Sequence, residues 1–187
     1  FPVHIVDNLS NSKLSVLERL KKLSDKNINF DEIDLRDIKS LSKVFRSVQP
    51  VLVIHFAGLK AVAESLEYPL NYYENNVVSS LNLLKVMNEV NCNKLVFSSS
   101  ATVYGCPTYL PYDEKHPTVP VNPYGRTKLY SESMFADWAE CIGSRSVISL
   151  RYFNPVGAHS SGIIGEDPNG IPNNLLPIIA KVASMDK

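Results

Sequence analysis

Short apolar runs alternate with segments in which apolar residues recur at helical spacing. The runs at 3–6, 28–35, 51–54, 94–97 and 147–151 predict strands. The helical repeats between them predict helices over about 14–23, 38–48, 69–87, 123–142 and 174–187. Pro50 follows one predicted helix, and Pro69 and Pro123 open two others, where proline suits the first turn. Asn122 is predicted to cap the helix that Pro123 opens.

This alternation predicts an α/β protein with a doubly wound parallel sheet of the Rossmann-like type. Strands that alternate with helices are joined by right-handed crossovers, which make neighbouring strands parallel. The run at 51–54 is apolar at every position, as a strand buried on both faces requires. In such sheets, ligands bind at the carboxyl ends of the strands.

Polar or glycine-containing groups follow five of the predicted strands. They are Asp7, Asp34, the segment 56–58, the serines 98–100 and the segment 152–154. Strand ends are often polar, so any one of these groups alone indicates little. Five such groups on one edge of a parallel sheet favour a binding site there.

Composition narrows the classes of ligand. The chain has 187 residues, 44% hydrophobic and 20% charged, which is in the range of a globular domain. Nineteen basic and nineteen acidic residues leave no net charge to attract nucleic acid or an anionic membrane. The cysteines at 92, 106 and 141 are unevenly spaced and contain no CxxC pair, which argues against a disulfide framework and a structural zinc site. No metal ligand set is expected.

The start of the chain lacks one part of a dinucleotide site. Such a site has a glycine-rich turn after its first strand and an acidic residue about 20 positions later. Asp7 fits the acidic residue, but no glycine-rich turn precedes it, and none of the eight glycines stands in a suitable context. We therefore expect a sheet that lacks the first strand and the glycine-rich turn, in a chain that is cut short.

Tyr124 and Lys128 form a YxxxK pair near the start of a predicted helix. Residues four apart share a helix face, so the ammonium is expected near the phenol. A nearby cation favours the phenolate, and this lowers the pKa of a tyrosine toward the range of a useful base. The spacing alone is common, and most such pairs are a packed tyrosine beside an exposed lysine. The serines 98–100 raise the odds, because Ser100 or a neighbour could complete a Ser-Tyr-Lys group.

Five blocks of sequence resemble the UDP-glucose 4-epimerase family of the extended short-chain dehydrogenases/reductases. The blocks are HFAGLKAV at 55–62, FSSSATVYG at 97–105, NPYG at 122–125, RYFNPVGAH at 151–159 and GEDPNGIPNNL at 165–175. The first and fourth blocks are far more specific than YxxxK. Arg126 and Thr127 stand where Lys-Ser is common in the family, outside the catalytic pair.

The resemblance implies roles for individual residues. The catalytic set would be Tyr124 as base, Lys128 as its partner and Ser100 as the contact to the substrate hydroxyl. The residues implied to bind NAD are Asp7, Asn8, Asn11, Ser12, Asp34, Leu35, Phe56, Ala57, Gly58, Leu59, Lys60, Asn76, Ser98, Tyr124, Lys128 and Phe153. Those implied to bind the UDP-sugar are Ser100, Tyr124, Asn154, Asn174 and Leu175. Nothing pairs His55 or His159 with a second catalytic group, so both are interpreted as structural.

The implied activity is the NAD-dependent interconversion of UDP-glucose and UDP-galactose by transient oxidation at C4. Residues 1–150 would be a partial NAD-binding domain, and 151–187 the start of an incomplete substrate-binding portion. The family also implies a cytoplasmic protein and a homodimer that uses the helices near Tyr73 and Tyr130. A chain that lacks both ends of the enzyme is expected to have little activity by itself.

Three alternatives stay open. A sugar-nucleotide dehydratase would carry an acidic residue just before Val-Tyr-Gly, where this chain has Ala101-Thr102. A non-catalytic binding protein could use the same fold, since a fold does not fix a function. The width of substrate choice, with or without N-acetylated sugars, is not determined by these residues.

Overall fold

The computed structural model describes residues 2–24, 26, 28–166 and 175–185, and these residues form two compact units. One unit comprises Phe1–Glu32 with Asn154–Lys187, and the other comprises Ile33–Phe153. The division by function near residue 150 stays a prediction. Asn174 lies outside the described residues, as do the ends of the chain.

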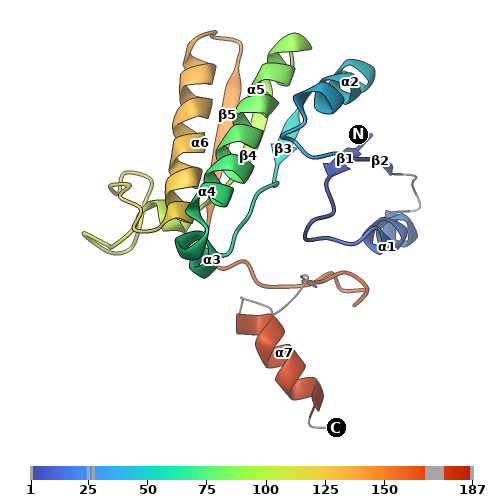
Figure 1. Ribbon diagram of the computed structural model, residues 1–187. Helices are drawn as coiled ribbons and strands as arrows, with labels where there is room; N and C mark the ends of the chain where they lie inside the picture. Colours follow the sequence, from blue (N-terminus) through green and yellow to red (C-terminus); the bar gives the residue numbers. More distant parts are fainter. Residues whose placement is uncertain (1, 25, 27, 167–174, 186–187) are drawn as a thin grey trace. The chain divides into compact units, whose positions relative to one another are not determined.

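The first unit contains a pair of parallel strands (Figure 1). Strand β1, His4–Asp7, pairs with β2, Asn29–Glu32, and helix α1, Ser15–Ser24, connects them. The His4 ring nitrogen Nε2 lies 2.7 Å from Asp31 Oδ2 across the pair. β2 ends three residues before the end of the run predicted at 28–35. Helix α7, Leu175–Met185, belongs to the same unit.

The second unit is built on a three-stranded parallel sheet, which confirms the predicted α/β fold class. Its strands are β3, Val53–His55, β4, Lys94–Ser100, and β5, Ser146–Tyr152. Their order is β3-β4-β5, and both pairings are parallel. In register, β4 ends level with β5, with Ser100 opposite Tyr152.

The segment predicted as one helix from Pro69 is divided into three. A short α4 leads into a π-helical segment, η1, and then into the regular helix α5. A further helix, α3, precedes them and was not predicted. The bounds of the remaining elements of this unit are α2 Ile38–Val48, α3 Val62–Glu67, α4 Pro69–Tyr72, η1 Tyr73–Val78, α5 Ser79–Glu89, the 3-10 turn η2 Ala101–Val103 and α6 Pro123–Glu140.

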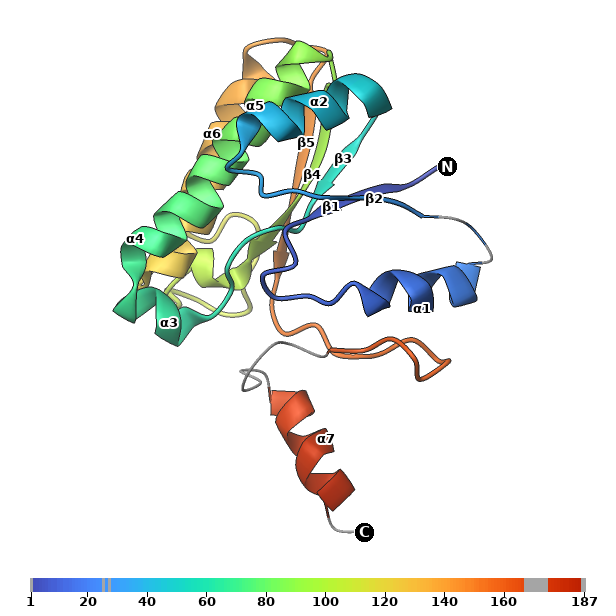
Figure 2. The same cartoon turned by 45° about the vertical axis from the view of Figure 1, so that its right-hand side comes forward.

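Helix α6 packs against β4, β5 and α5, and the core of the unit lies along this contact (Figures 1 and 2). Phe97 of β4 and Phe135 of α6 are both almost completely buried, and their ring centroids lie 4.8 Å apart at 72°. Edge-to-face rings at this distance add attraction to the burial of their area. The same contact holds the first turn of α6 at the carboxyl end of β4.

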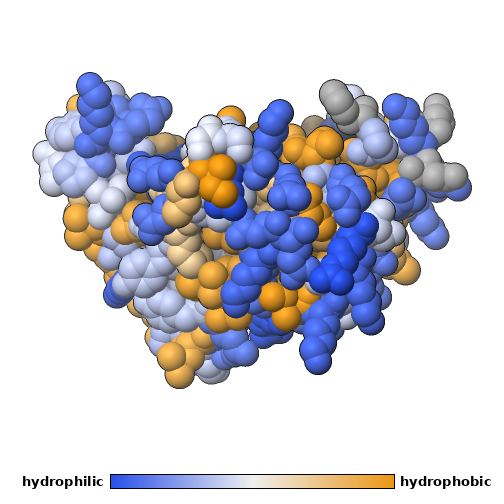
Figure 3. All heavy atoms as spheres, turned by 90° about the horizontal axis from the view of Figure 1, so that it is seen from above, coloured by the Kyte–Doolittle hydropathy of each residue, from blue (hydrophilic) through white to orange (hydrophobic). Residues whose placement is uncertain are grey.

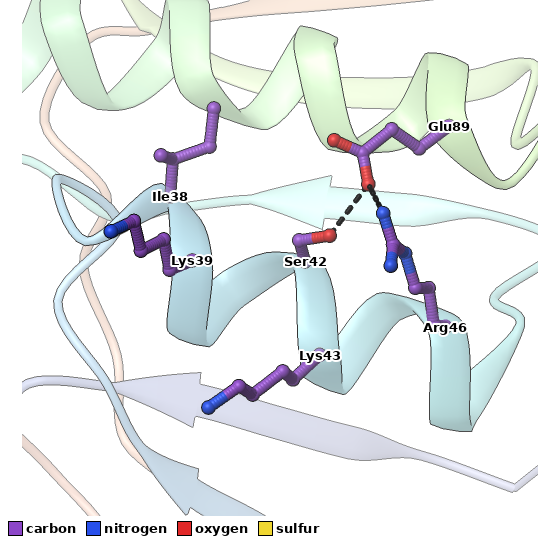
Figure 4. A pocket seen from close by; sticks show the side chains of 6 residues that line it. All are labelled: Ile38, Lys39, Ser42, Lys43, Arg46 and Glu89. Atoms are coloured by element: carbon purple, nitrogen blue, oxygen red, sulfur yellow. Dashed lines mark hydrogen bonds and ion pairs between the residues drawn. The ribbon is translucent and has the colours of Figure 1, made fainter.

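Helix α2 lies along α5 and is fixed at both of its ends. The Asp37 carboxylate accepts hydrogen bonds from the Lys39 and Ser40 backbone amides at 3.2 Å, as an N-cap does. Figure 4 shows the side chains that line the pocket between the two helices, where Glu89 of α5 accepts from Ser42 Oγ at 2.5 Å and from Arg46 Nη2 at 3.1 Å. These hydrogen bonds lower the pKa of Glu89.

The surface has mixed character. On the face drawn in Figure 3, hydrophilic and hydrophobic residues are intermixed, as the 20% of charged residues would suggest. Within the described ranges, no helix is long and apolar enough to cross a membrane. The three cysteines are free thiols, with Cys92 buried and the other two exposed.

Candidate functional site

Three of the five predicted groups meet at one edge of the second unit's sheet. Because β3, β4 and β5 are adjacent and parallel, the segment 56–58, the serines 98–100 and Tyr152-Phe153 all lie at the carboxyl ends of their strands. Phe56 and Phe153 are 65% and 58% exposed, so their rings are available to a ligand. This edge is where a parallel α/β sheet binds its ligands.

The first turn of α6 brings Tyr124 to this edge. Asn122 is the N-cap, as predicted, and its Oδ1 accepts from the Gly125 amide at 2.7 Å. Pro123 occupies the first helical position, where its missing amide proton costs nothing. At Gly125 the helix approaches η2 so closely that an added Cβ would lie 2.8 Å from the Thr102 carbonyl oxygen. Only glycine permits this approach, which sets the position of the neighbouring Tyr124.

Tyr124 is 8% exposed and forms a hydrogen bond with Ser100. Burial raises the pKa of Tyr124, because a phenolate is poorly solvated there, and the Ser100 hydrogen bond partly offsets this by favouring the phenolate. The ring of Tyr72 meets the Tyr124 ring edge to face, with centroids 6.5 Å apart. The phenol is thus held on one side by α4 and on the other by the end of β4.

Lys128 lies one turn further along α6, on the same face. Its Nζ donates to the Ser98 carbonyl oxygen at 2.9 Å, and lies 4.9 Å from the Phe97 ring centroid and 5.8 Å from that of Tyr124. Burial lowers the pKa of Lys128 to about 8. The predicted proximity of Tyr124 and Lys128 is therefore present, but the predicted fall in the pKa of Tyr124 is not, because burial outweighs the favourable contacts.

Asn76 fixes the loop that follows β3. Its Oδ1 accepts from the Leu59 amide at 2.8 Å, while its Nδ2 donates to the Leu59 carbonyl at 3.0 Å and to Thr127 Oγ1 at 3.1 Å. Gly58 has φ +142, and an added Cβ there would lie 3.0 Å from Asn76 Oδ1. Asn76 thus joins this loop to α6 from within the π-helical segment, a type of segment that is frequent at functional sites.

The other predicted cofactor residues of this unit lie on its surface loops. Ala57 and Lys60 are exposed beside Gly58. Asp34 accepts from Arg36 Nε at 2.9 Å and Nη2 at 2.8 Å, so its carboxylate already has a cationic partner. The Leu35 carbonyl accepts from Asn82 Nδ2 of α5 at 3.2 Å, which ties this turn to the helix.

The remaining predicted residues belong to the first unit and are described with it. Asp7 ends β1, and its Oδ1 accepts from the Leu9 amide at 2.6 Å and from Ser12 Oγ at 2.8 Å. Asn8 accepts from the Ser10 amide at 3.1 Å, and Asn11 lies in the same turn. Asn154 and Leu175 are exposed, and Asn174 is outside the described residues.

Sequence reasoning missed two residues of α6 that hold the site residues in place through hydrogen bonds. Thr127 is fully buried, and its hydroxyl donates to the Tyr124 carbonyl at 2.7 Å. Glu132 accepts from Ser99 Oγ and from Arg151. The sequence did carry one signal for Glu132. It stands eight residues after Tyr124 in the same predicted helix, and residues at multiples of four share a helix face.

His55 is a structural residue in the second unit, as predicted. It is 4% exposed, and its Nε2 lies 3.1 Å from Ser80 Oγ. Burial, with a smaller effect of the Lys128 charge, lowers the pKa of His55 to about 3. A neutral imidazole at the end of β3 therefore packs on Phe97 and leaves the proton chemistry to other groups.

The arrangement can bind and deprotonate a hydroxyl group. Ser100 and Tyr124 offer two hydroxyls that share a hydrogen bond, and the buried Lys128 ammonium lies beside them. An ammonium has three donors, and the Ser98 carbonyl accepts one of them. A cation, a phenol and a serine at a strand edge suit a ligand rich in hydroxyl groups.

Comparisons with known proteins give the relatives of this chain. The chain is 52% identical to UDP-glucose 4-epimerase 2 of Arabidopsis thaliana over 182 residues, covering 96% of this chain and 52% of that protein. It is 51% identical to UDP-glucose 4-epimerase of Dictyostelium discoideum over 179 residues, covering 96% and 52%. The chain thus spans about half the length of the curated relatives that it matches.

Solved structures show the same likeness. UDP-glucose 4-epimerase from Bifidobacterium longum, in complex with NAD+ and UDP, superposes with a TM-score of 0.96 at 49% identity, over 100% of this chain and 56% of that one. The predicted Rossmann-like fold is therefore confirmed. A family model described as GDP-mannose 4,6 dehydratase matches residues 1–186, and the chain belongs to that family.

Proposed function

We propose that this chain is part of a UDP-glucose 4-epimerase, which interconverts UDP-glucose and UDP-galactose with NAD as cofactor. The observation that carries the proposal is the meeting of Tyr124, Lys128 and Ser100 at the carboxyl end of β4. The relatives and solved structures of about half identity bear this name, and one of those structures holds NAD+ and UDP. The activity is proposed for the full-length protein, because the chain spans only about half of these relatives.

The residues of the second unit fit NAD. The buried Lys128 ammonium can donate to ribose hydroxyls with the protons that Ser98 does not accept. Gly58 leaves the backbone after β3 open to close approach, and the exposed aromatic rings of Phe56 and Phe153 offer apolar surface. In the first unit, Asp7 stands at a strand end, where an acidic residue can accept from the adenosine ribose. When bound, NAD supplies the acceptor for the hydride of C4.

The chain's own residues would position the sugar and move one proton. Tyr124 accepts the proton of the 4-hydroxyl and returns it in the second half of the reaction. Ser100 has one hydroxyl proton, which it can donate either to Tyr124 or to the sugar oxygen, and its position beside the phenol orients the sugar hydroxyl toward Tyr124. Lys128 stabilises negative charge on the phenol, and burial of the group keeps water from competing for the proton.

A dehydratase is the second candidate, and the description of the matching family names one. Elimination of water needs an acid and a base beside the ones described. At the positions before Val-Tyr-Gly, Ala101 has no such group, and the Thr102 hydroxyl donates to Ser100 Oγ at 3.0 Å. No carboxylate occupies either position, so the residues favour epimerisation.

We also propose a cytoplasmic homodimer. The free cysteines agree with a reducing compartment. Tyr73 and Tyr130 stack with ring centroids 6.1 Å apart, and Tyr130 is 48% exposed, so this pair offers aromatic surface to a second copy. Light scattering on the purified full-length protein tests the dimer, and a monomer mass would contradict it.

The direct test is conversion of UDP-galactose by the full-length protein and by its Tyr124→Phe variant. Tyr68→Phe is the matched control, because it removes a phenol that is 51% exposed and belongs neither to the site nor to the proposed dimer surface. The wild type and the control should form UDP-glucose, and Tyr124→Phe should lose at least about a hundredfold in kcat. A product lighter by one water would favour the dehydratase. Equal conversion by Tyr124→Phe would contradict the proposed function.

A further inference from the structure

Three consecutive serines at the end of β4 each hold a different residue of α6. Ser100 bonds to Tyr124, the Ser98 carbonyl accepts from Lys128, and Ser99 Oγ donates to Glu132. The three partners stand at intervals of four residues in α6, so they share one stripe of the helix surface. The contacts of Tyr124 and Lys128 belong to the proposed catalytic group, whereas no role has been given so far to the contact between Ser99 and Glu132.

The third contact is buried and charge-assisted. The Glu132 side chain is 10% exposed, and its Oε1 accepts both from Ser99 Oγ and from Arg151 Nε at 3.1 Å. Its Oε2 accepts from Arg151 Nη2 at 2.7 Å. Hydrogen bonds to a charged carboxylate are among the strongest in proteins, and a two-pronged arginine contact also fixes geometry. This carboxylate therefore ties α6 to two neighbouring strands at once.

The contact lies level with the catalytic group along the sheet. Ser99 of β4 is opposite Arg151 of β5 in the strand register, so Glu132 bridges a pair of residues that are already adjacent. The Arg151 guanidinium carbon lies 4.8 Å from the Tyr104 ring centroid, and that ring lies 6.5 Å from the ring of Phe153. One carboxylate thus links the helix that carries Tyr124 to an aromatic group beside the same edge.

We propose that Glu132 is a positioning residue for the reaction, an inference that rests on the proposed function. By holding Ser99 and Arg151, it fixes the rotation and the height of α6 against the end of β4. The neighbouring contacts of Tyr124 with Ser100 and of Lys128 with Ser98 then keep their distances. A small misplacement of a catalytic group can cost a large factor in rate, so this tie affects turnover more than binding.

The test compares two variants with two matched controls in the full-length protein. Ser99→Ala removes the tie to β4 without a change of charge, and it leaves Glu132 Oε1 with its bond from Arg151 Nε. Its control is Ser133→Ala, because Ser133 is exposed on α6 and bonds only within the helix, to the Leu129 carbonyl at 3.1 Å.

The second variant, Glu132→Gln, has Glu89→Gln as its control. Glu89 also pairs with an arginine and a serine, but it lies on the surface between α2 and α5 (Figure 4). Each protein is measured for kcat and KM with UDP-galactose, for bound NAD and for its urea midpoint. The urea midpoint separates a loss of stability from a loss of positioning.

Both variants should lose about tenfold in kcat with KM changed less than about twofold, while both controls stay at wild-type values. In Ser99→Ala, the pH at which turnover rises should also move upward, because a looser Ser100 bond favours the phenolate of Tyr124 less. The ionisable neighbours of Tyr124, namely Lys128 and Tyr72, keep their charge in this variant.

These measurements separate a failure of the proposed function from a failure of the positioning inference. If the wild type does not convert UDP-galactose, the proposed function fails and the positioning inference falls with it. If the wild type is active but Ser99→Ala and Glu132→Gln turn over within about twofold of their controls, the inference alone is overturned, and Glu132 only stabilises the fold. Loss of stability in a variant without loss of kcat in the folded fraction overturns the inference in the same way.

Discussion

Replacing Asn76 by aspartate tests whether its amide group holds the loop after β3. The change keeps the shape of the side chain and the oxygen that accepts from the Leu59 amide at 2.8 Å. It replaces the Nδ2 donor by an oxygen that faces the Leu59 carbonyl at 3.0 Å and Thr127 Oγ1 at 3.1 Å. Two hydrogen bonds are lost, and acceptors then face each other in a side chain that is 5% exposed.

The two lost bonds are together worth about 2 kcal/mol, and the unpaired buried acceptors cost about 1 kcal/mol more, so Asn76→Asp should lose roughly 3 kcal/mol of unfolding free energy at neutral pH. Of these three neighbours, the Leu59 amide alone is a donor to the new carboxylate, so burial outweighs this hydrogen bond and raises the folded pKa of the carboxyl above its unfolded value. The protonated carboxyl at position 76 therefore contributes to stability in acid, below the pKa that it has in the unfolded chain. This contribution is lost as the pH rises through the pKa that the carboxyl has in the folded protein.

Urea unfolding of Asn76→Asp and of a control, Asn71→Asp, measures this difference at acid and at neutral pH. Asn71 is exposed on the adjoining helix α4, so its replacement adds the same charge without burial. The difference in unfolding free energy should be about 3 kcal/mol at neutral pH and should shrink in acid, where the protonated carboxyl can donate to the Leu59 carbonyl. Equal stability at neutral pH, or a difference that does not depend on pH, would refute the reasoning.

Two further predictions concern α6. Gly125→Ala places a Cβ 2.8 Å from the Thr102 carbonyl oxygen and should cost about 1–3 kcal/mol in urea unfolding, whereas Gly143→Ala, with nothing within 4 Å, should stay within about 0.5 kcal/mol. If both variants unfold alike, the close approach is not real. Lys128→Met should flatten the dependence of stability on pH. The folded pKa of Lys128, about 8, lies below its unfolded value, so the unfolded chain binds more protons above that pH and wild-type stability rises there. Between pH 8 and about pH 10, the unfolding free energy of the wild type should rise by up to about 2 kcal/mol relative to that of Lys128→Met. Parallel pH dependences in the two proteins would show that the ammonium is not buried.

Local signals in the sequence predicted the strands of the parallel sheet and the start of helix α6. Apolar runs predicted the strands of the parallel sheet correctly. The run at 51–54, however, is not buried on both faces as predicted, since Val51, Leu52 and Ile54 are 78%, 44% and 55% exposed. Asn122 and Pro123 marked the start of α6 correctly, since both the cap and the fixed φ of proline act within one turn. The pair of Tyr124 and Lys128 shares a face as its spacing predicts.

Features that depend on distant contacts were beyond the sequence. The π-helical segment at Tyr73–Val78 has no apolar period of its own, and its buried Asn76 is held by residues of the β3 loop and α6. The pKa of Tyr124 was predicted to fall, because spacing shows the cation but not the burial that opposes it. Glu132 was not singled out from the sequence, because its burial depends on a contact with Arg151 of a distant strand.

Proton transfer by Tyr124 can be followed through the oxidation state of the bound cofactor, because hydride leaves C4 only as the 4-hydroxyl loses its proton. UDP-galactose is added to the NAD-bound full-length protein, and the near-ultraviolet absorbance of reduced nicotinamide is followed for the wild type and for Tyr124→Phe at equal cofactor content. Reduced cofactor should form in the wild type and be nearly absent in Tyr124→Phe. Reduction of the cofactor to the same extent and at the same rate in both proteins would contradict this role of Tyr124.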